Sequence, residues 1–280
     1  MSAVTPHVRV AIVGAGFGGL GAAISLRRAG YRDFVVFERA DDVGGTWRDN
    51  TYPGCACDVP SHLYSFSFAP HPGWSRSFSG QLEIWAYLRE CVRRFELGPH
   101  LRLGHELRAA TWDGGERRWR LQTSAGAYTA DLLVAAAGPL SEPAIPPLPG
   151  LATFTGAVFH SARWDHDLDL AGRRVAVVGT GASAVQFVPR IAPAVAQLSL
   201  FQRTPAWIIP RHDRATGARA RRFYAAVPPA QRFVRAVAYL QREAFAVGFL
   251  QPRLMRLAER VALAHLRAAV PDPHLRAKLT

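Results

Sequence analysis

Two glycine-rich segments carry the chemistry that is visible in the sequence. The first is Gly14-Ala-Gly16-Phe-Gly-Gly19, and the second is Gly179-Thr180-Gly181-Ala182-Ser183-Ala184. Each follows a short apolar run and precedes a stretch with helical spacing. In that setting the first glycine allows a tight turn, the second lets the backbone approach a pyrophosphate, and the third position lets helix and strand pack closely. Both segments are therefore typical of dinucleotide-binding cradles.

The residues that follow the two cradles differ in charge. Glu38 lies 19 residues after Gly19, where a carboxylate can accept hydrogen bonds from ribose hydroxyls. Arg203 lies 19 residues after Ala184, where a guanidinium can bind a 2′-phosphate, and Thr204 could add a hydrogen bond. We therefore expect NADP(H) at the second site only. The usual partner of such a site is a flavin, because a flavin accepts a hydride and then reacts with oxygen.

Buried strands and amphipathic helices must position these cradles. The fold class that their pattern predicts is α/β, with two Rossmann-like domains in three layers and a helical segment at the C-terminal end. Strands are predicted at 8–13, 34–37, 131–137, 174–178 and 198–201, helices at 20–29, 81–95 and 183–191, and a hairpin at 107–112 and 119–123.

Three further expectations concern a helix, a long loop and the C-terminal segment. The helix over 81–95 is expected to bury one face, made of Leu82, Trp85, Leu88 and Val92. The turn-rich segment 41–80 is long enough to predict a functional loop. From Arg214 onward, proline-broken helices are expected to use six aromatic residues as core material: Phe223, Tyr224, Phe233, Tyr239, Phe245 and Phe249.

Composition excludes several classes of protein. Three cysteines in 280 residues argue against a disulfide scaffold and fit a cytoplasmic protein, and Cys55 and Cys57 lack the second pair that a metal site needs. The net charge is +13, of which residues 211–280 contribute +10. Because no nucleic-acid-binding motif accompanies this local excess, nucleic acid is not an expected partner. No apolar run predicts a membrane span.

A third segment connects the two cradles to a known family. The stretch Phe154-Thr-Gly156-Ala-Val-Phe-His160-Ser-Ala-Arg-Trp164-Asp165 resembles the FxGxxxHxxxW fingerprint, followed by Pro or Asp, of the type I Baeyer–Villiger monooxygenases. These enzymes are class B flavoprotein monooxygenases, and the resemblance runs over essentially the whole chain. Gly44-Gly45-Thr46-Trp47 also resembles the flavin loop of that family.

The resemblance implies roles for particular residues. It implies that four residues line FAD, namely Thr46, Trp47, Asp58 and Tyr64. It also implies that the backbone of 56–58 lies near NADP, that the backbone of Leu107 meets the adenine, and that Asp58 orients an active-site arginine. His160 and Trp164 would serve the reaction from the linker that couples the two domains. The resemblance implies no metal.

The activity implied by the family is oxygenation of a ketone. NADPH would reduce FAD, the reduced flavin would bind O2 as a flavin peroxide, and one oxygen would enter next to the carbonyl to give an ester or lactone. Two alternatives stay open. One is a monooxygenase that oxidises N or S in soft nucleophiles, and the other is a non-catalytic FAD/NADP-binding fragment.

The resemblance also implies a domain division and an incomplete chain. Family members are about twice as long, and Thr280 falls inside their helical insertion, so the peroxide-stabilising arginine is expected beyond it. A truncated gene product, a gene fragment and one half of a split protein with a separate C-terminal half are the alternatives. The expected domains are 1–142 (FAD-binding), 143–172 (linker with the fingerprint), 173–212 (first NADP-binding unit) and 213–280 (helical insertion).

Overall fold

The structure is a computed structural model that describes residues 5–279, apart from the side chains of Phe245, Phe249, Pro252 and Leu254. Contacts divide the chain into two units. The first unit contains Met1–Thr51 and Gln81–Trp164, and the second contains Tyr52–Gly80 and Asp165–Thr280. Each unit is described by itself below, and the domain roles expected for 1–142, 143–172, 173–212 and 213–280 stay predictions.

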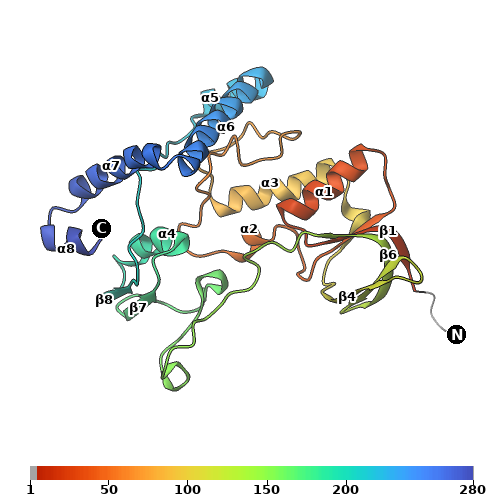
Figure 1. The fold of residues 1–280 in the computed structure, drawn as a ribbon, viewed down its shortest axis with the longest axis horizontal. Coiled ribbons are helices and arrows are strands. Elements are labelled where there is room, and N and C mark those ends of the chain that lie inside the picture. Colours follow the sequence, from red (N-terminus) through yellow and green to blue (C-terminus); the bar gives the residue numbers. More distant parts are fainter. Residues whose placement is uncertain (1–4, 280) are drawn as a thin grey trace. The chain divides into compact units, whose positions relative to one another are not determined.

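A six-stranded sheet organises the first unit (Figure 1), in the order β3-β2-β1-β6-β5-β4. Its strands are β1 (His7–Val13), β2 (Phe34–Phe37), β3 (Leu101–Arg102), β4 (Leu107–Asp113), β5 (Arg118–Thr123) and β6 (Gly126–Ala135). The pairs β1–β2, β1–β6 and β2–β3 are parallel, whereas β5 runs antiparallel to both of its neighbours. The apolar runs of β1 and β2 become buried because helices cover the parallel part of the sheet.

The α-helices among the described residues of this unit are α1 (Phe17–Arg28), α2 (Thr46–Asp49) and α3 (Gln81–Arg94). Helix α1 crosses from β1 to β2 and buries Leu20, Ala23 and Ile24, which have the i, i+3, i+4 spacing of one helix face. Helices α1 and α3 run beside each other next to the sheet (Figure 1). The result is the β–α–β crossover that the glycine motif needs.

The second unit has a smaller sheet and more helix. Strands β7 (Arg174–Val178) and β8 (Gln197–Phe201) pair in parallel, and α4 (Ala182–Ile191) connects them. Its other helices are α5 (Ala218–Ala226), α6 (Pro228–Leu250), α7 (Pro252–Ala269) and α8 (Pro273–Lys278). The last three each begin at a proline, which lacks the N–H that a first-turn residue would leave unbonded.

The predicted α/β class with two Rossmann-like units is confirmed. The expected two-strand sheet of the second unit is present, with an open edge. The strand expected at 131–137 begins earlier and ends earlier, at Gly126 and Ala135, because its first half pairs with β5 of the hairpin. The two-residue strand β3 was not predicted, since so short a segment has no periodicity. Among the described residues, no helix combines the length and apolarity that crossing a membrane requires.

The buried face of α3 differs from the predicted one. Leu88 is fully buried as expected, but Leu82 is 71% exposed. The buried stripe runs through Ile84, Tyr87, Leu88 and Cys91. The sequence pattern was ambiguous because apolar residues occur on both faces of this helix.

The aromatic core expected in the C-terminal helices is wrong for three of its members. Phe223, Phe233 and Tyr239 are each more than half exposed, while Tyr224 is half-buried. The side chains of Phe245 and Phe249 lie outside the described set. These helices therefore leave apolar surface uncovered within the described chain.

Two leucines on α3 allow the corrected face to be tested. Replacing Leu88 by Ala is expected to lower the free energy of unfolding by about 2–5 kcal/mol, because a fully buried side chain leaves a cavity. Replacing Leu82 by Ala should change it by less than about 0.5 kcal/mol. Urea unfolding followed by circular dichroism measures both. Equal losses in the two variants would contradict the observed face.

Candidate dinucleotide-binding site

The first glycine segment forms a turn that only glycine fits. Gly14 has φ +96°, and its N–H donates to the carbonyl of Phe37 at 2.8 Å, which connects the end of β1 to the end of β2. A Cβ on Gly19 would lie 1.8 Å from the carbonyl oxygen of Gly14. Helix α1 begins after Gly16 without a side-chain cap, so its first N–H groups face the turn as donors for an anion.

The side chain of Glu38 is buried beside this turn and interacts with three donors. Its Oε2 accepts from the N–H of Ala15 at 2.8 Å, and its Oε1 accepts from the N–H of Ala40 and from Arg48 Nη1, both at 3.1 Å. The residue is only 5% exposed. Because an ionised carboxylate has about four acceptor positions, three donors leave roughly one for a ribose hydroxyl. Glu38 therefore shapes the glycine turn as well as offering an acceptor.

Arg48 is a site residue that the sequence analysis missed. Burial lowers the pKa of Arg48, but its hydrogen bond with Asp49 and the charges of Glu38 and Asp49 outweigh that effect and raise it. The guanidinium therefore stays charged beside the carboxylate of Glu38. No signal in the sequence identified it, since its partner lies ten residues away in an irregular loop.

The loop after β2 is fixed against the first cradle. The N–H of Gly44 donates to the carbonyl of Ala15 at 2.9 Å, and a Cβ on Gly45 would lie 3.2 Å from the Cα of Gly16. Trp47 is buried and its carbonyl accepts from Gln81, whereas Thr46 is exposed. The structure thus brings the predicted residues Gly14, Gly16, Gly19, Glu38, Thr46 and Trp47 into one region. Leu107 packs against the core cluster that includes the last residue of β2, Phe37.

The second cradle repeats the same closure. The N–H of Gly179, with φ +107°, donates to the carbonyl of Phe201 at 2.9 Å, and α4 begins after Gly181 without a side-chain cap. Ala184 occupies the third glycine position and is buried, so this helix–strand contact has room for a methyl group. Of the other predicted residues here, Thr180 and Ser183 are half-buried and Ala182 is exposed.

The register of the strands shifts the expected position of Arg203. Val13 pairs with Phe37 in the first unit, and Val178 pairs with Phe201 in the second. Gln202 therefore takes the place of Glu38, and Arg203 lies one residue further along. The connection from the glycine turn to the end of the second strand is one residue shorter in the second unit than in the first, so an equal count of residues reached a different position. Arg203 and Thr204 are both exposed after the end of β8.

The loop at 52–58 packs on the helix of the second cradle. Gln186 of α4 accepts from the N–H of Ala56 at 3.0 Å and donates to its carbonyl at 2.9 Å, as a strand partner would. Its Oε1 also accepts from the hydroxyl of Tyr52 at 3.2 Å. Burial raises the pKa of Tyr52 to about 12, so the hydroxyl stays protonated and can donate. The sequence analysis missed Gln186, because its partner Ala56 lies 130 residues away and no local pattern encodes that pairing.

The remaining predicted residues lie in different places. Asp58 is exposed and Tyr64 half-buried, and both belong to the second unit. His160 and Trp164 belong to the first unit. The His160 side chain accepts from the N–H of Ala162 at 3.1 Å and so begins a short 3₁₀ turn, while the Trp164 ring packs edge-on against Phe159 at 5.2 Å.

The cysteines are buried or partly buried free thiols. Burial raises the pKa of Cys57 to about 11 and also raises the pKa of Cys55 and Cys91. Each is therefore protonated near neutral pH and a poor nucleophile. Among the described residues, no group of three or more His, Cys, Asp or Glu side chains could hold a metal ion.

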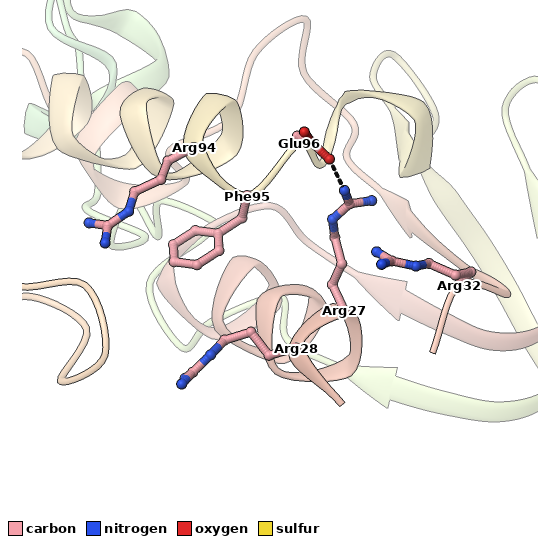
Figure 2. Close-up of a pocket in the computed structure, with 6 residues that line it drawn as sticks. All are labelled: Arg27, Arg28, Arg32, Arg94, Phe95 and Glu96. Atoms are coloured by element: carbon pink, nitrogen blue, oxygen red, sulfur yellow. Dashed lines mark hydrogen bonds and ion pairs between the residues drawn. The ribbon is translucent and has the colours of Figure 1, made fainter. Parts of the chain in front are cut away.

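An arginine-lined pocket of about 290 Å³ lies elsewhere on the first unit (Figure 2). It is lined by Arg27, Arg28, Arg32, Arg94, Phe95 and Glu96. Arg27, Arg28 and Arg94 lie in the last turns of α1 and α3, where cations complement the helix dipole, and the other three residues follow these helices in the chain. Arg27 is paired with Glu96. None of the residues that line this pocket belongs to the glycine turn at the N-terminus of α1.

The close packing at Gly19 gives a testable contrast. Replacing Gly19 by Ala is expected to lower the free energy of unfolding by about 1–3 kcal/mol, because α1 or the glycine turn must shift. Gly18 is the matched control, since its added Cβ would make an ordinary 3.5 Å contact with Ala136. The Gly18→Ala protein should be as stable as wild type or slightly more stable. Thermal unfolding of the two variants compares them, and a stable Gly19→Ala protein would contradict the packing.

Comparison with known proteins agrees with this geometry. Residues 12–90 match the family described as an NAD(P)-binding Rossmann-like domain. The chain is 56% identical over 278 residues to a Baeyer–Villiger monooxygenase of Streptomyces coelicolor, which covers 99% of this chain and 54% of that protein. It is 49% identical over 280 residues to a Baeyer–Villiger monooxygenase of Pseudomonas aeruginosa, covering 99% of this chain and 53% of that protein. The chain therefore spans about half the length of these relatives.

Solved structures give the same result. A steroid monooxygenase bound to NADP superposes with a TM-score of 0.85 at 34% identity, over 98% of this chain and 60% of that one. A closed form of cyclohexanone monooxygenase superposes with a TM-score of 0.82 at 32% identity, over 99% of this chain and 60% of that one.

Proposed function

The chain is by sequence a member of the Baeyer–Villiger monooxygenase family that spans about half the length of its relatives, and we propose that it forms the nucleotide-binding part of an NADPH-dependent flavin monooxygenase. The observation that carries the proposal is the pair of equivalent closures, Gly14 to Phe37 and Gly179 to Phe201, each at the start of a helix. Two such cradles in one chain fit one flavin and one nicotinamide nucleotide.

The first cradle would hold FAD. The start of α1, where no side chain caps the helix, suits a pyrophosphate, and Glu38 retains about one acceptor position for a ribose hydroxyl. The loop with Thr46 and Trp47 lies against the same turn. When bound, FAD would supply hydride acceptance and oxygen activation. The role of this part of the chain is to bind and orient that group, with Leu107 proposed at its adenine.

The second cradle would hold NADP(H). Arg203, which is exposed one residue beyond the position of Glu38, is proposed to bind the 2′-phosphate, with the neighbouring Thr204 adding a hydrogen bond. The neutral Gln202 in the position of Glu38 avoids the repulsion that a carboxylate would cause. Gln186 fixes the loop that leads to Asp58 directly on the helix of this cradle.

Three residues are proposed to serve the reaction without transferring protons to the substrate. Asp58 is proposed to orient an arginine that would stabilise developing negative charge by its own positive charge. His160 and Trp164, within the fingerprint, are proposed to couple the two cradles. The substrate class is proposed to be ketones, which would be converted to esters or lactones with O2.

The full reaction is proposed to need a further protein segment, about as long as the part of the relatives that this chain does not match. The exposed apolar residues Val178, Leu200 and Phe201 around the two-stranded sheet support this requirement. The cytoplasm is the proposed compartment, because Cys55, Cys57 and Cys91 are free thiols.

The visible spectrum of the chain purified with FAD tests the proposal first. We expect a flavin band from this chain alone. Once the further segment is supplied, we expect oxidation of NADPH and formation of ester or lactone from a ketone when ketones are compared with amines and sulfides. A flavin band without NADPH oxidation would indicate a binding fragment. Amine oxide or sulfoxide alone would indicate the N- or S-oxidising alternative, and the absence of a flavin band would overturn the proposal.

Nucleotide preference provides the second test. Replacing Arg203 by Ala should weaken NADPH binding about 10- to 100-fold, because a charged hydrogen-bonded contact contributes roughly 1.5–3 kcal/mol, while NADH binding should hardly change. Arg219 is the control, since it is an exposed arginine at the start of α5. Isothermal titration of both nucleotides measures the effect. Equal losses for NADPH and NADH would contradict a 2′-phosphate contact.

A further inference from the structure

Several carbonyl groups in the segment from Asp58 to His71 accept hydrogen bonds from side chains of one helix, α6. Within the described residues 52–80, turns and isolated bridges replace regular helices and strands. The carbonyls of such a segment need other donors when they are removed from water. Side chains of α6 bind five of them, namely those of Asp58, His62, Leu63, Ser65 and His71.

Arg235 makes most of these contacts. Its Nη1 lies 3.0 Å from the carbonyl of His62, 2.9 Å from that of Leu63 and 3.1 Å from that of Ser65. It also lies 3.2 Å from the hydroxyl of Ser65. A guanidinium is always charged, and hydrogen bonds from a charged donor are stronger than neutral ones. One side chain thus fixes three carbonyls within four consecutive residues.

The other contacts lie on the same face of α6. Gln231 donates from Nε2 to the carbonyl of His71 at 2.6 Å, and Arg242 donates to that of Asp58 at 3.3 Å. Residues 231, 235, 238 and 242 follow the i, i+4, i+7, i+11 spacing of one helical face. Gln231 and Ala238 are buried, as expected for a face that packs against protein. The loop therefore contacts several side chains along one face of α6 and does not depend on a single residue.

The same loop is also held at its beginning. Gln186 of α4 binds both backbone groups of Ala56. Ser61 and Ser79 join the interior of the loop through hydroxyls 2.7 Å apart, and Ser61 also donates to the carbonyl of Arg76 at 2.7 Å. The stretch between Ala56 and His71 is thus anchored by α4 at one end and by α6 along the rest.

We propose that Arg235 is a positioning residue, whose contacts with the carbonyls of residues 62–65 order the loop containing Asp58 and Tyr64 for nicotinamide nucleotide binding. The nucleotide part of this inference rests on the proposed function. Tyr64 lies between two residues whose carbonyls Arg235 binds, so this guanidinium holds the backbone on both sides of Tyr64. Asp58 is held by its own carbonyl through Arg242 on the same helix face.

Hydrogen exchange on the complete 280-residue chain tests the proposal without relying on activity. Replacing Arg235 by Met keeps the aliphatic stem but removes every donor. Amide exchange in residues 58–71 should then become about tenfold faster or more, while exchange in β1 and α1 should stay unchanged. Arg235→Lys should restore much of the protection, since an ammonium also donates to several carbonyls.

Arg232→Met is the matched control, because Arg232 lies on the same helix with an exposed side chain. It should leave exchange in 58–71 unchanged. Titration with NADPH should show about tenfold weaker binding for Arg235→Met and wild-type binding for Arg232→Met.

The outcomes separate the two proposals. Unchanged exchange in Arg235→Met, or an equal change in Arg232→Met, would overturn the positioning role. Failure of the wild-type chain to bind NADPH would overturn the proposed function and the nucleotide part of this inference. Faster exchange with unaltered NADPH binding would also overturn that nucleotide part.

Discussion

The carboxylate of Glu38 joins three parts of the first unit that are separate in sequence. It receives the N–H of Ala15 from the glycine turn, that of Ala40 from the chain after β2, and the guanidinium of Arg48. A buried charge is costly unless donors surround it, so each of these segments must stay in place for the others to be stable. The glycine turn, the end of β2 and the loop that follows are therefore held together by the carboxylate of Glu38.

The two cradles share a backbone hydrogen bond from the first glycine to the end of the second strand, but neighbouring protein atoms surround them to different extents. In the first, Gly14 and Gly19 are forced by contacts with neighbouring backbone. In the second, a Cβ on Gly179 or Gly181 would meet nothing within 4 Å among the described atoms, and Ala184 replaces the third glycine. The first cradle has a six-stranded sheet behind it, whereas the second has two strands. Crowding therefore does not require the glycines of the second cradle, whereas the φ of +107° at Gly179 favours glycine there.

The segment 52–80 shows how a loop can belong to one unit by sequence position and to another by contact. It follows the loop that covers the first cradle, yet Gln186 and the polar face of α6 bind it within the second unit. Polar side chains on helices bind carbonyl groups of this loop in addition to the backbone hydrogen bonds of its turns. A helix from the segment whose aromatic residues are largely exposed thus contributes through Gln231, Arg235 and Arg242.

The glycine spacing, the buried strands and the proline-started helices could be predicted from the sequence alone, because each depends on local backbone conformation and on short-range periodicity. The tertiary structure decided what depends on distant partners. Register moved Arg203 one position beyond the place of Glu38, and packing chose Ile84 over Leu82 as the buried residue of α3. Gln186 and Arg235 acquired their roles from carbonyl groups more than a hundred residues away, and no local pattern encodes such a pairing.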